Sequence, residues 1–109
     1  MTKDELPELE RLVLLAILHC GERAYGVPVM DEIRHRTGRP VLRPAVYEAL
    51  RRLEGKGLVT ARLGDPTPRR GGRARRFYAV TAPGLDSLKK ARESWSRMWQ
   101  GLDHIFDAT

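Results

Sequence analysis

The segment Pro44-Ala-Val-Tyr-Glu-Ala-Leu-Arg-Arg-Leu-Glu54 decides the fold of this 109-residue chain. Its apolar residues Val46, Leu50 and Leu53 recur at i, i+4 and i+7, which is the spacing of one face of an α-helix. Pro44 suits the first helical turn, where no N–H is needed, and two of the three residues after Glu54 are glycines that end the helix. The segment therefore predicts a short helix that packs along one side and leaves its polar side free to contact a partner.

A β-hairpin is expected directly after this helix. Residues 58–63 have the pattern of a strand, and residues 74–80 contain the β-favouring Phe77 and Tyr78. Between them, residues 64–72 are rich in glycine, proline and arginine, which suits a turn and neither a helix nor a strand. A basic helix followed by a hairpin with an arginine-rich tip is typical of a recognition helix and a wing.

Two further helices precede the central one. The first is expected to have Pro7 in its first turn and to stop at Gly21, and the second to span residues 27–37. The first is apolar around most of its circumference, so we expect it to be central and to leave some apolar surface for a partner. The second helix and the basic one after it match a helix-turn-helix, which the hairpin turns into the winged variety. Tyr25 suits either the core or a phosphate contact, and the core is favoured because an apolar helix face follows it.

A single long helix is predicted at the C-terminus. Thr81 is a good N-cap, Pro83 lies in the first turn, and Gly101 is the only later helix breaker. At about 25 residues, or roughly 40 Å, this helix is too long for one small domain to bury. Its apolar residues step by three and four, as in a heptad seam. These are Leu88, Ala91, Trp95, Met98, Leu102 and Ile105.

The seam predicts a homodimer, because a second copy is the simplest partner for it. The alternative is an intrachain helix folded back over the first helix, which would use only part of the seam. The expected fold class is therefore mainly α with a small β-hairpin. We divide it into a winged helix-turn-helix over residues 1–81 and a C-terminal dimerisation helix over residues 82–109.

Positive charge is concentrated in the middle of the chain. Residues 1–33 carry a net charge of −4, residues 34–76 carry +10, and residues 77–109 carry none, which accounts for the formal +6. Such a localised field suits a polyanion, while the alternative is a solvated basic face that aids solubility. Because the excess coincides with the basic helix and the hairpin tip, we expect a nucleic acid as the partner.

Catalytic, metal-binding and membrane roles have little support. His19, His35 and His104 have no metal-ligand spacing, and neither a nucleophile with its base nor a phosphate-binding glycine loop is present, so no cofactor or metal is expected. The lone Cys20 forms no intrachain disulfide and suits a small buried hydrophobe in a reducing compartment. The longest apolar run has seven residues and follows an acidic start, so the chain is expected in the cytoplasm without a signal peptide or membrane span.

Several stretches carry a resemblance to a known family. They are Leu12-Val-Leu-Leu-Ala-Ile-Leu18, Ala24-Tyr-Gly26, Ala45-Val-Tyr47 running into Leu50-Arg-Arg-Leu-Glu54 and Gly57-Leu-Val59, and Gly71-Gly-Arg-Ala-Arg-Arg-Phe-Tyr-Ala-Val-Thr-Ala-Pro-Gly84. In the right order over nearly the whole chain, they resemble the PadR-like family of bacterial winged-helix transcriptional regulators. The resemblance implies a dimer that binds double-stranded operator DNA, usually represses a neighbouring gene, and is released by a small aromatic ligand or another signal. The C-terminal helix is similar to the short branch of the family, where it dimerises against the first helix of the other subunit, so Leu12 joins the expected interface.

The resemblance also implies roles for single residues. Tyr47 and Arg51 match helix positions that meet the DNA backbone and groove, and Trp95 matches a tryptophan that lines a drug pocket in multidrug-sensing relatives. Where the family often has a small or hydroxylic residue before the recognition helix, this chain has Leu42 and Arg43, so the capping should differ. The expected ligand-binding residues are Trp95 and, one turn on, Trp99. The expected DNA-binding residues are Arg43, Pro44, Ala45, Tyr47, Glu48, Arg51, Arg69, Arg70, Arg73, Arg75 and Arg76.

Several of these residues also suit a purely structural role. Glu48 and Arg51, three residues apart, suit a surface ion pair as well as contacts to base edges. Tyr47 suits a buried ring with a wet hydroxyl, and Trp95 suits plain interface core. For the whole chain, the rival hypotheses are a winged-helix protein-interaction module and a drug-binding sensor with secondary DNA contact.

Overall fold

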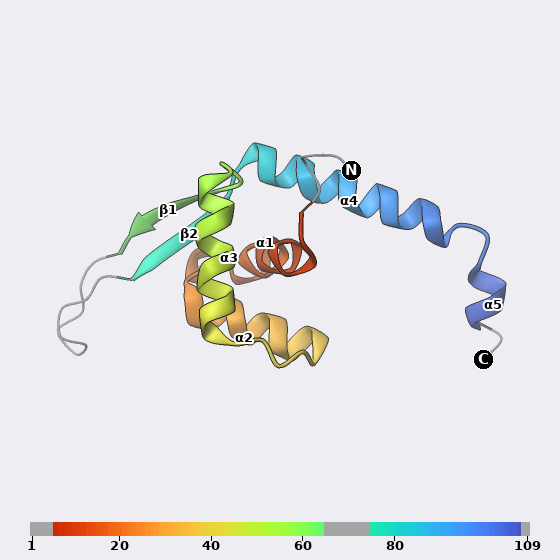
Figure 1. Cartoon of the computed structure of the whole chain (residues 1–109), viewed down its shortest axis with the longest axis horizontal. Coiled ribbons are helices and arrows are strands. Elements are labelled where there is room, and N and C mark those ends of the chain that lie inside the picture. The colour runs from red at the N-terminus through yellow and green to blue at the C-terminus, as the bar shows by residue number, and fades with distance from the viewer. Residues whose placement is uncertain (1–5, 65–74, 108–109) are drawn as a thin grey trace.

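The computed structural model describes residues 6–64 and 75–107, and within them it confirms a mainly helical winged helix-turn-helix with a two-stranded antiparallel hairpin. Figure 1 shows the hairpin on one side of the helical body and the C-terminal helices on the other. Three of the expected wing arginines, Arg69, Arg70 and Arg73, lie outside the described residues. The elements are α1 (Glu8–Cys20), η1 (Gly21–Arg23), α2 (Gly26–Thr37), α3 (Arg43–Gly55), β1 (Val59–Leu63), β2 (Arg76–Val80), α4 (Ala82–Trp99) and α5 (Asp103–Asp107).

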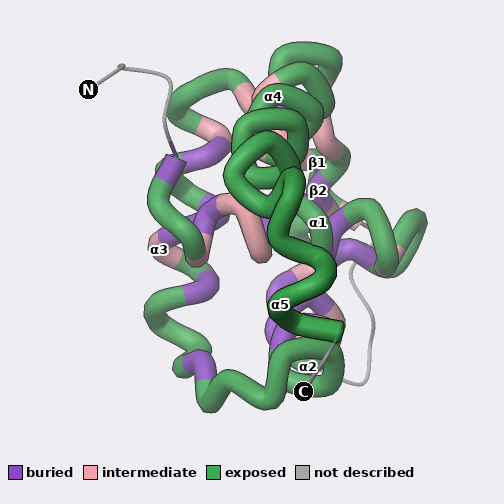
Figure 2. Tube along the Cα trace, turned by 90° about the vertical axis from the view of Figure 1, so that its right-hand side faces the viewer, coloured by how far each residue is buried: buried purple, intermediate pink, exposed green. Residues whose placement is uncertain are grey.

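The hydrophobic core lies between α1, α2, α3 and the hairpin. Its largest fully buried side chains come from all three helices: Val13, Leu14, Val29, Val46, Leu50 and Leu53. In Figure 2 the buried positions gather in this body. As predicted, α1 is the central helix, and its apolar surface is wider than the body covers, because Leu15 and Leu18 remain exposed.

Helix α3 begins and ends within one residue of the prediction. Leu42 occupies the N-cap position and makes no side-chain capping hydrogen bond, so the expected difference in capping is confirmed. A buried carboxylate steadies the other end of the helix, where the Nζ of Lys56 lies 2.6 Å from Glu10 of α1. The sequence pattern did not single out this pair, because its partners are 46 residues apart.

The hairpin and the start of α4 are held to the body by specific hydrogen bonds. Strand β1 pairs with β2 in the register Val59↔Val80 to Leu63↔Arg76. The N–H of Tyr78 donates to the carbonyl of Ala24 at 2.8 Å, which fixes β2 to the connection between α1 and α2. Thr81 is the predicted N-cap of α4: its Oγ1 accepts from the N–H of Gly84 and donates to the carbonyl of Gly57.

The prediction of one continuous C-terminal helix is wrong. Helix α4 ends at Trp99, Gly101 takes a left-handed conformation with φ of +83°, and α5 follows in a new direction. The break separates the expected seam into α4 positions, Leu102 in the turn, and Ile105 on α5. The chain is nevertheless extended: its radius of gyration is 16.2 Å, compared with about 13 Å for a compact domain of this length.

Candidate nucleic-acid interface

Helix α3 turns a polar face to solvent because its apolar face is anchored in the core. Val46, Ala49, Leu50 and Leu53 are buried, so the residues between them must point outward. The structure thereby brings the six helix residues of the expected DNA-binding set onto a single element. Of these, Arg43, Pro44, Ala45, Tyr47 and Arg51 are exposed and Glu48 is half-buried.

Glu48 is the centre of an ion-pair cluster on this face. The Nη2 of Arg51 lies 2.5 Å from one carboxylate oxygen of Glu48 and 2.7 Å from the other, and the Nε of Arg52 lies 3.2 Å from the first. The hydrogen bond from Arg51 lowers the pKa of the Glu48 carboxyl and raises the pKa of the Arg51 guanidinium. The ion pair considered as an alternative for Glu48 and Arg51 is therefore present, with Arg52 as a third member that the sequence interpretation missed.

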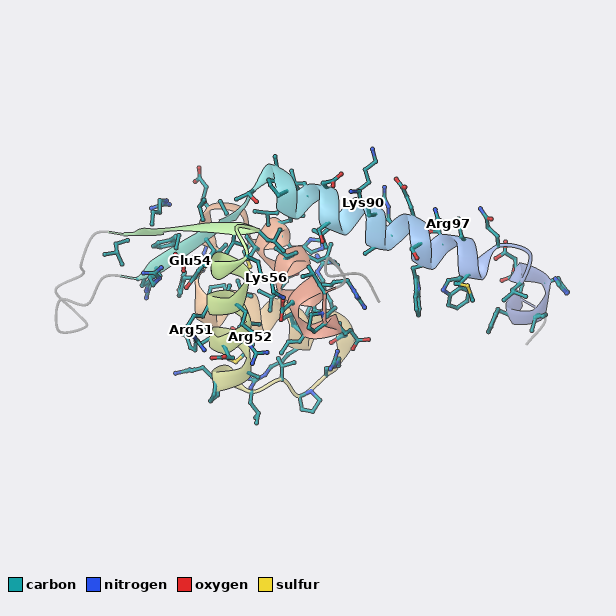
Figure 3. All side chains as sticks on the ribbon, turned by 45° about the horizontal axis from the view of Figure 1, so that its top comes forward. Arg51, Arg52, Glu54, Lys56, Lys90 and Arg97 are labelled. Atoms are coloured by element: carbon teal, nitrogen blue, oxygen red, sulfur yellow. The ribbon has the colours of Figure 1, made fainter. Side chains whose placement is uncertain are left out.

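A second ion pair joins α3 to the hairpin. The Nη2 of Arg76 on β2 lies 2.8 Å from both carboxylate oxygens of Glu54. The guanidinium of Arg76 also lies 6.0 Å from the ring centroid of Tyr78, at the outer limit of a cation–π contact. Figure 3 shows Arg51, Arg52 and Glu54 along α3, so both groups of ion pairs involve residues of this helix.

Arg75 and Arg62 take part in a series of cation–π and aromatic contacts at the loop end of the hairpin. The guanidinium of Arg75 lies 4.4 Å from the ring centroid of Tyr25, Tyr25 meets Phe77 edge-on at 5.4 Å, and Arg62 lies 4.8 Å from the Phe77 ring. Tyr25, for which the core was favoured, is half-buried and serves as a packing partner for the hairpin. Arg62 was not among the predicted site residues, although its place on a strand beside the arginine-rich loop was a usable signal.

Tyr47 combines the two roles that were considered for it. Its ring lies against Gly26 at the start of α2, so closely that a Cβ atom on Gly26 would collide with the ring and hydroxyl. Tyr47 nevertheless remains 44% exposed. It is therefore a packed residue that still presents surface next to Glu48 and Arg51.

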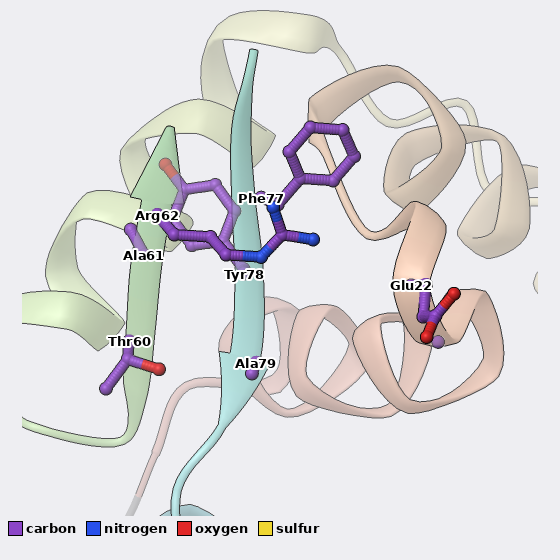
Figure 4. A pocket seen from close by; sticks show the side chains of 8 residues that line it. Glu22, Thr60, Ala61, Arg62, Phe77, Tyr78 and Ala79 are labelled. Carbon is purple, nitrogen blue, oxygen red and sulfur yellow. The ribbon is translucent and has the colours of Figure 1, made fainter. Parts of the chain in front are cut away.

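A shallow hollow of about 360 Å³ lies between η1 and the hairpin. Figure 4 shows Glu22 on one side of it, with Arg62 and Phe77 over the strands. Its lining comes from η1 and the middle of β1 and β2, and it includes none of the aromatic residues of α4 and α5. Its mixed lining of opposite charges, backbone and two aromatic residues does not define a particular ligand.

The residues expected at the dimer interface fall into two groups. Leu12 and Leu88 pack against the core of their own chain, and Ala91 is half-buried. The remaining members are exposed: Trp95 by 67% and Met98 by 75%, together with Leu102 and Ile105.

Aromatic side chains cluster where the chain turns from the end of α4 into α5. The ring centroids of Trp95 and Trp99 are 6.5 Å apart, and those of Trp99 and Phe106 are 4.9 Å apart. Phe106 was not predicted because it lies off the heptad seam of a continuous helix. The break at Gly101 is what brings it to Trp99.

The described residues contain no group of three or more His, Cys, Asp or Glu side chains arranged to hold a metal ion. Cys20 is half-buried beside the core, and this burial raises the pKa of its thiol, which favours the unreactive protonated form. Over the same parts of the chain, no helix has both the length and the hydropathy that a bilayer crossing requires.

Comparisons with known proteins agree with this architecture. A PadR family transcription regulator from Clostridium difficile R20291 superposes with a TM-score of 0.72 over 92% of this chain and 99% of its own, at 20% identity, which supports the fold. A PadR family transcriptional regulator from Eggerthella lenta DSM 2243 is 27% identical with a TM-score of 0.66, covering 94% and 88% of the two chains. An uncharacterized protein of Lysinibacillus sphaericus is 27% identical over 97 residues, 87% of this chain and 84% of that protein. The model of the transcriptional regulator PadR-like family matches residues 14–90. The chain therefore belongs to the PadR-like family of transcriptional regulators, whose members are regulators and not enzymes.

Proposed function

We propose that this protein is a cytoplasmic, homodimeric, sequence-specific DNA-binding repressor. The observation that carries the proposal is the exposed polar face of α3, which is anchored by four buried residues and carries Arg43, Tyr47 and Arg51. In a helix-turn-helix dimer, two such helices enter successive major grooves of a pseudo-palindrome, with half-site centres about 34 to 36 Å apart. Occupation of an operator in that way would block transcription of the adjacent gene.

Direct base contacts are assigned to the beginning and middle of α3. Arg43 has no hydrogen-bond or ion-pair partner among the described residues, so its guanidinium is available to a guanine edge or a phosphate. A good bidentate contact of arginine with guanine gives about 1 to 3 kcal/mol of discrimination against the wrong base. Arg75, Arg76 and the arginines of residues 65–74 are assigned to the DNA backbone, where they add affinity without sequence preference.

Dimerisation is assigned to the C-terminal helices. Residues 92–107 are all exposed, and they include Trp95, Met98 and Ile105. Large apolar side chains that are exposed together on one segment mark an interaction site. A second copy is the partner that would cover the same surface on both chains at once.

Release by a ligand is assigned to the aromatic cluster. We infer that a flat aromatic compound stacks on Trp95, with Trp99 as a second wall, across the two-fold axis of the dimer. Titration of a panel of flat aromatic cations and neutral compounds into wild-type and Trp95→Ala protein tests this assignment. Quenching of tryptophan fluorescence that is lost in Trp95→Ala would support it, and unchanged fluorescence across the panel would contradict it.

The deciding experiment measures binding to the DNA just upstream of the gene and to a scrambled duplex of equal length. Affinities should be compared at about 50 and 200 mM salt, because phosphate contacts weaken steeply over this range while base contacts preserve the preference. Tight binding that keeps a large preference at the higher salt supports the repressor. Salt-sensitive binding with no preference for any sequence, after selection from a random pool, would favour the protein-interaction module.

A further inference from the structure

Two carboxylates lie among the arginines of the proposed DNA-binding surface. Glu48 accepts hydrogen bonds from Arg51 and Arg52, and Glu54 accepts two from Arg76. Three of the four described arginines on α3 and β2 are thus paired, whereas Arg43 has no such partner within the described residues. The two carboxylates thus offset two of the four positive charges of these arginines in the free protein.

We propose that Glu48 and Glu54 act as built-in competitors for DNA phosphates, which hold Arg51, Arg52 and Arg76 until an operator offers enough contacts to displace them. Their effect is on specificity: they weaken binding to non-cognate DNA more than binding to the operator. The inference rests on the proposed contact between α3 and DNA.

The geometry of these pairs resembles the geometry of a phosphate contact. A carboxylate presents two oxygens to a guanidinium in the same way as a phosphate does, and arginine binds either group with paired hydrogen bonds. The two oxygens of Glu48 lie 2.5 and 2.7 Å from the Nη2 of Arg51, so Arg51 has a good acceptor before any DNA arrives. A phosphate must therefore replace an existing partner.

The exposure of the pairs makes this replacement feasible. Side chains of Arg51 and Arg52 are 74% and 59% exposed, and ion pairs at such positions are weak because water screens them. A correctly seated complex adds base contacts and several phosphates together, which can displace the carboxylates. Loosely bound DNA makes fewer simultaneous contacts, so the internal pairs reduce its affinity.

The same distances give Glu48 a role in the free protein other than the expected contact to a base edge. A base-contacting glutamate accepts from the N4 amino group of cytosine. Both Glu48 oxygens already accept hydrogen bonds, and the lowered pKa of the carboxyl keeps it charged at neutral pH. The position of Glu48 on the helix is thus used to hold two arginines.

The test compares Glu48→Gln, Glu54→Gln and the double variant with wild type on the scrambled duplex and on the sequence that wild type prefers. Asp86→Asn is the matched control, because it removes one negative charge from an exposed i,i+4 pair with Lys90 on α4. Figure 3 shows Lys90 on α4, well away from Arg51 and Arg52. Circular dichroism verifies that every variant is folded.

Each single variant should bind the scrambled duplex about three- to tenfold more tightly at low salt, and each arginine newly placed on a phosphate should steepen the salt dependence by about one unit. The double variant should show the product of the two effects, since the clusters share no partner. The preference for the operator should fall, and Asp86→Asn should change either affinity less than about twofold.

Three results would overturn the inference. If Asp86→Asn bound the scrambled duplex as much more tightly as the glutamate variants do, net charge alone would explain the effect. If Glu48→Gln bound the scrambled duplex with unchanged affinity, the ion pairs would not compete with DNA phosphates. If Glu48→Gln lost affinity or sequence preference at a single operator position only, Glu48 would instead be a base-contacting residue. If wild type binds no duplex at all, the proposed function fails first and this inference falls with it.

Discussion

The winged body, formed by α1 to β2, and the C-terminal arm, residues 92–107, differ in how far they bury their apolar side chains. In the body, Val13, Leu50 and other large side chains are completely buried by the same chain. In the arm every residue is exposed, including Trp95 and Met98. The body therefore buries its core within one chain, whereas the exposure of the arm supports the proposal that a second copy covers it.

The start of α4, which leads from the body to the arm, is tightly packed. Gly84 lies where α4 begins, buried so closely against the carbonyl of Leu58 and the side chain of Val80 that a Cβ atom would clash. Thr81 adds hydrogen bonds on both sides of the junction. The body therefore determines the direction in which α4 leaves it, and with it the spacing of two α3 helices in the proposed dimer.

The largest effect is expected in the core of the body. Leu50→Ala should lower the free energy of unfolding by about 2 to 5 kcal/mol, because it leaves a cavity among fully buried neighbours. Urea denaturation at a fixed protein concentration measures the change. Leu63→Ala is the control: Leu63 is 66% exposed on β1, so the same truncation should change the stability by less than about 0.5 kcal/mol. Equal losses in the two variants would contradict the contrast between body and surface.

Association of the arm should be the next most sensitive property. Met98→Arg places a charge in the apolar surface and should weaken self-association by about tenfold to a hundredfold while the body stays folded. Glu93→Gln raises the net charge by the same amount from a position about 140° away around α4, and should leave association nearly unchanged. Sedimentation velocity over a range of concentrations measures both. A wild-type chain that remains monomeric at all concentrations would refute the proposed dimer.

The junction gives a smaller effect. Gly84→Ala should destabilise the protein by about 1 to 3 kcal/mol, because the added methyl overpacks the contact with Leu58 and Val80. Gly55→Ala is a matched control, since a Cβ atom there meets nothing within 4 Å, and we expect it to be neutral or stabilising. Thermal unfolding compares the two. If Gly84→Ala were as harmless as Gly55→Ala, the start of α4 would not be tightly packed against Leu58 and Val80.

The smallest effect is expected at the break in the arm. Gly101→Ala should disfavour the left-handed turn by about 1 kcal/mol and so favour continuation of α4 into α5. The helical signal in the circular dichroism spectrum should increase slightly. The tryptophan fluorescence emission should change, because Phe106 moves away from Trp99. Gly101→Asn should preserve the break, because asparagine tolerates the left-handed region better than alanine does. Identical spectra for Gly101→Ala and wild type would show that packing, not the glycine, sets the break.

Local patterns in the sequence determined the body of this protein. The spacing of Val46, Leu50 and Leu53 predicted α3 to within one residue, and the Thr81 cap predicted the start of α4. Such features depend on helix periodicity and on hydrogen bonds between near neighbours, which a linear sequence records directly. The charge pattern likewise predicted a basic surface on α3 and the hairpin.

Tertiary structure alone decided how that surface and the arm are arranged. Glu54 meets Arg76 across 22 residues because α3 packs beside β2, and Arg75 meets Tyr25 because β2 bonds to the connection between α1 and α2. The arm shows the same limit, since the heptad pattern runs through Gly101 without a gap and only the backbone conformation there brings Phe106 to Trp99. Contacts between distant residues depend on packing free energy summed over the whole chain. The same is true of whether a glycine takes a helical or a left-handed conformation. The sequence therefore determined which groups are available, and the fold determined which of them are already paired.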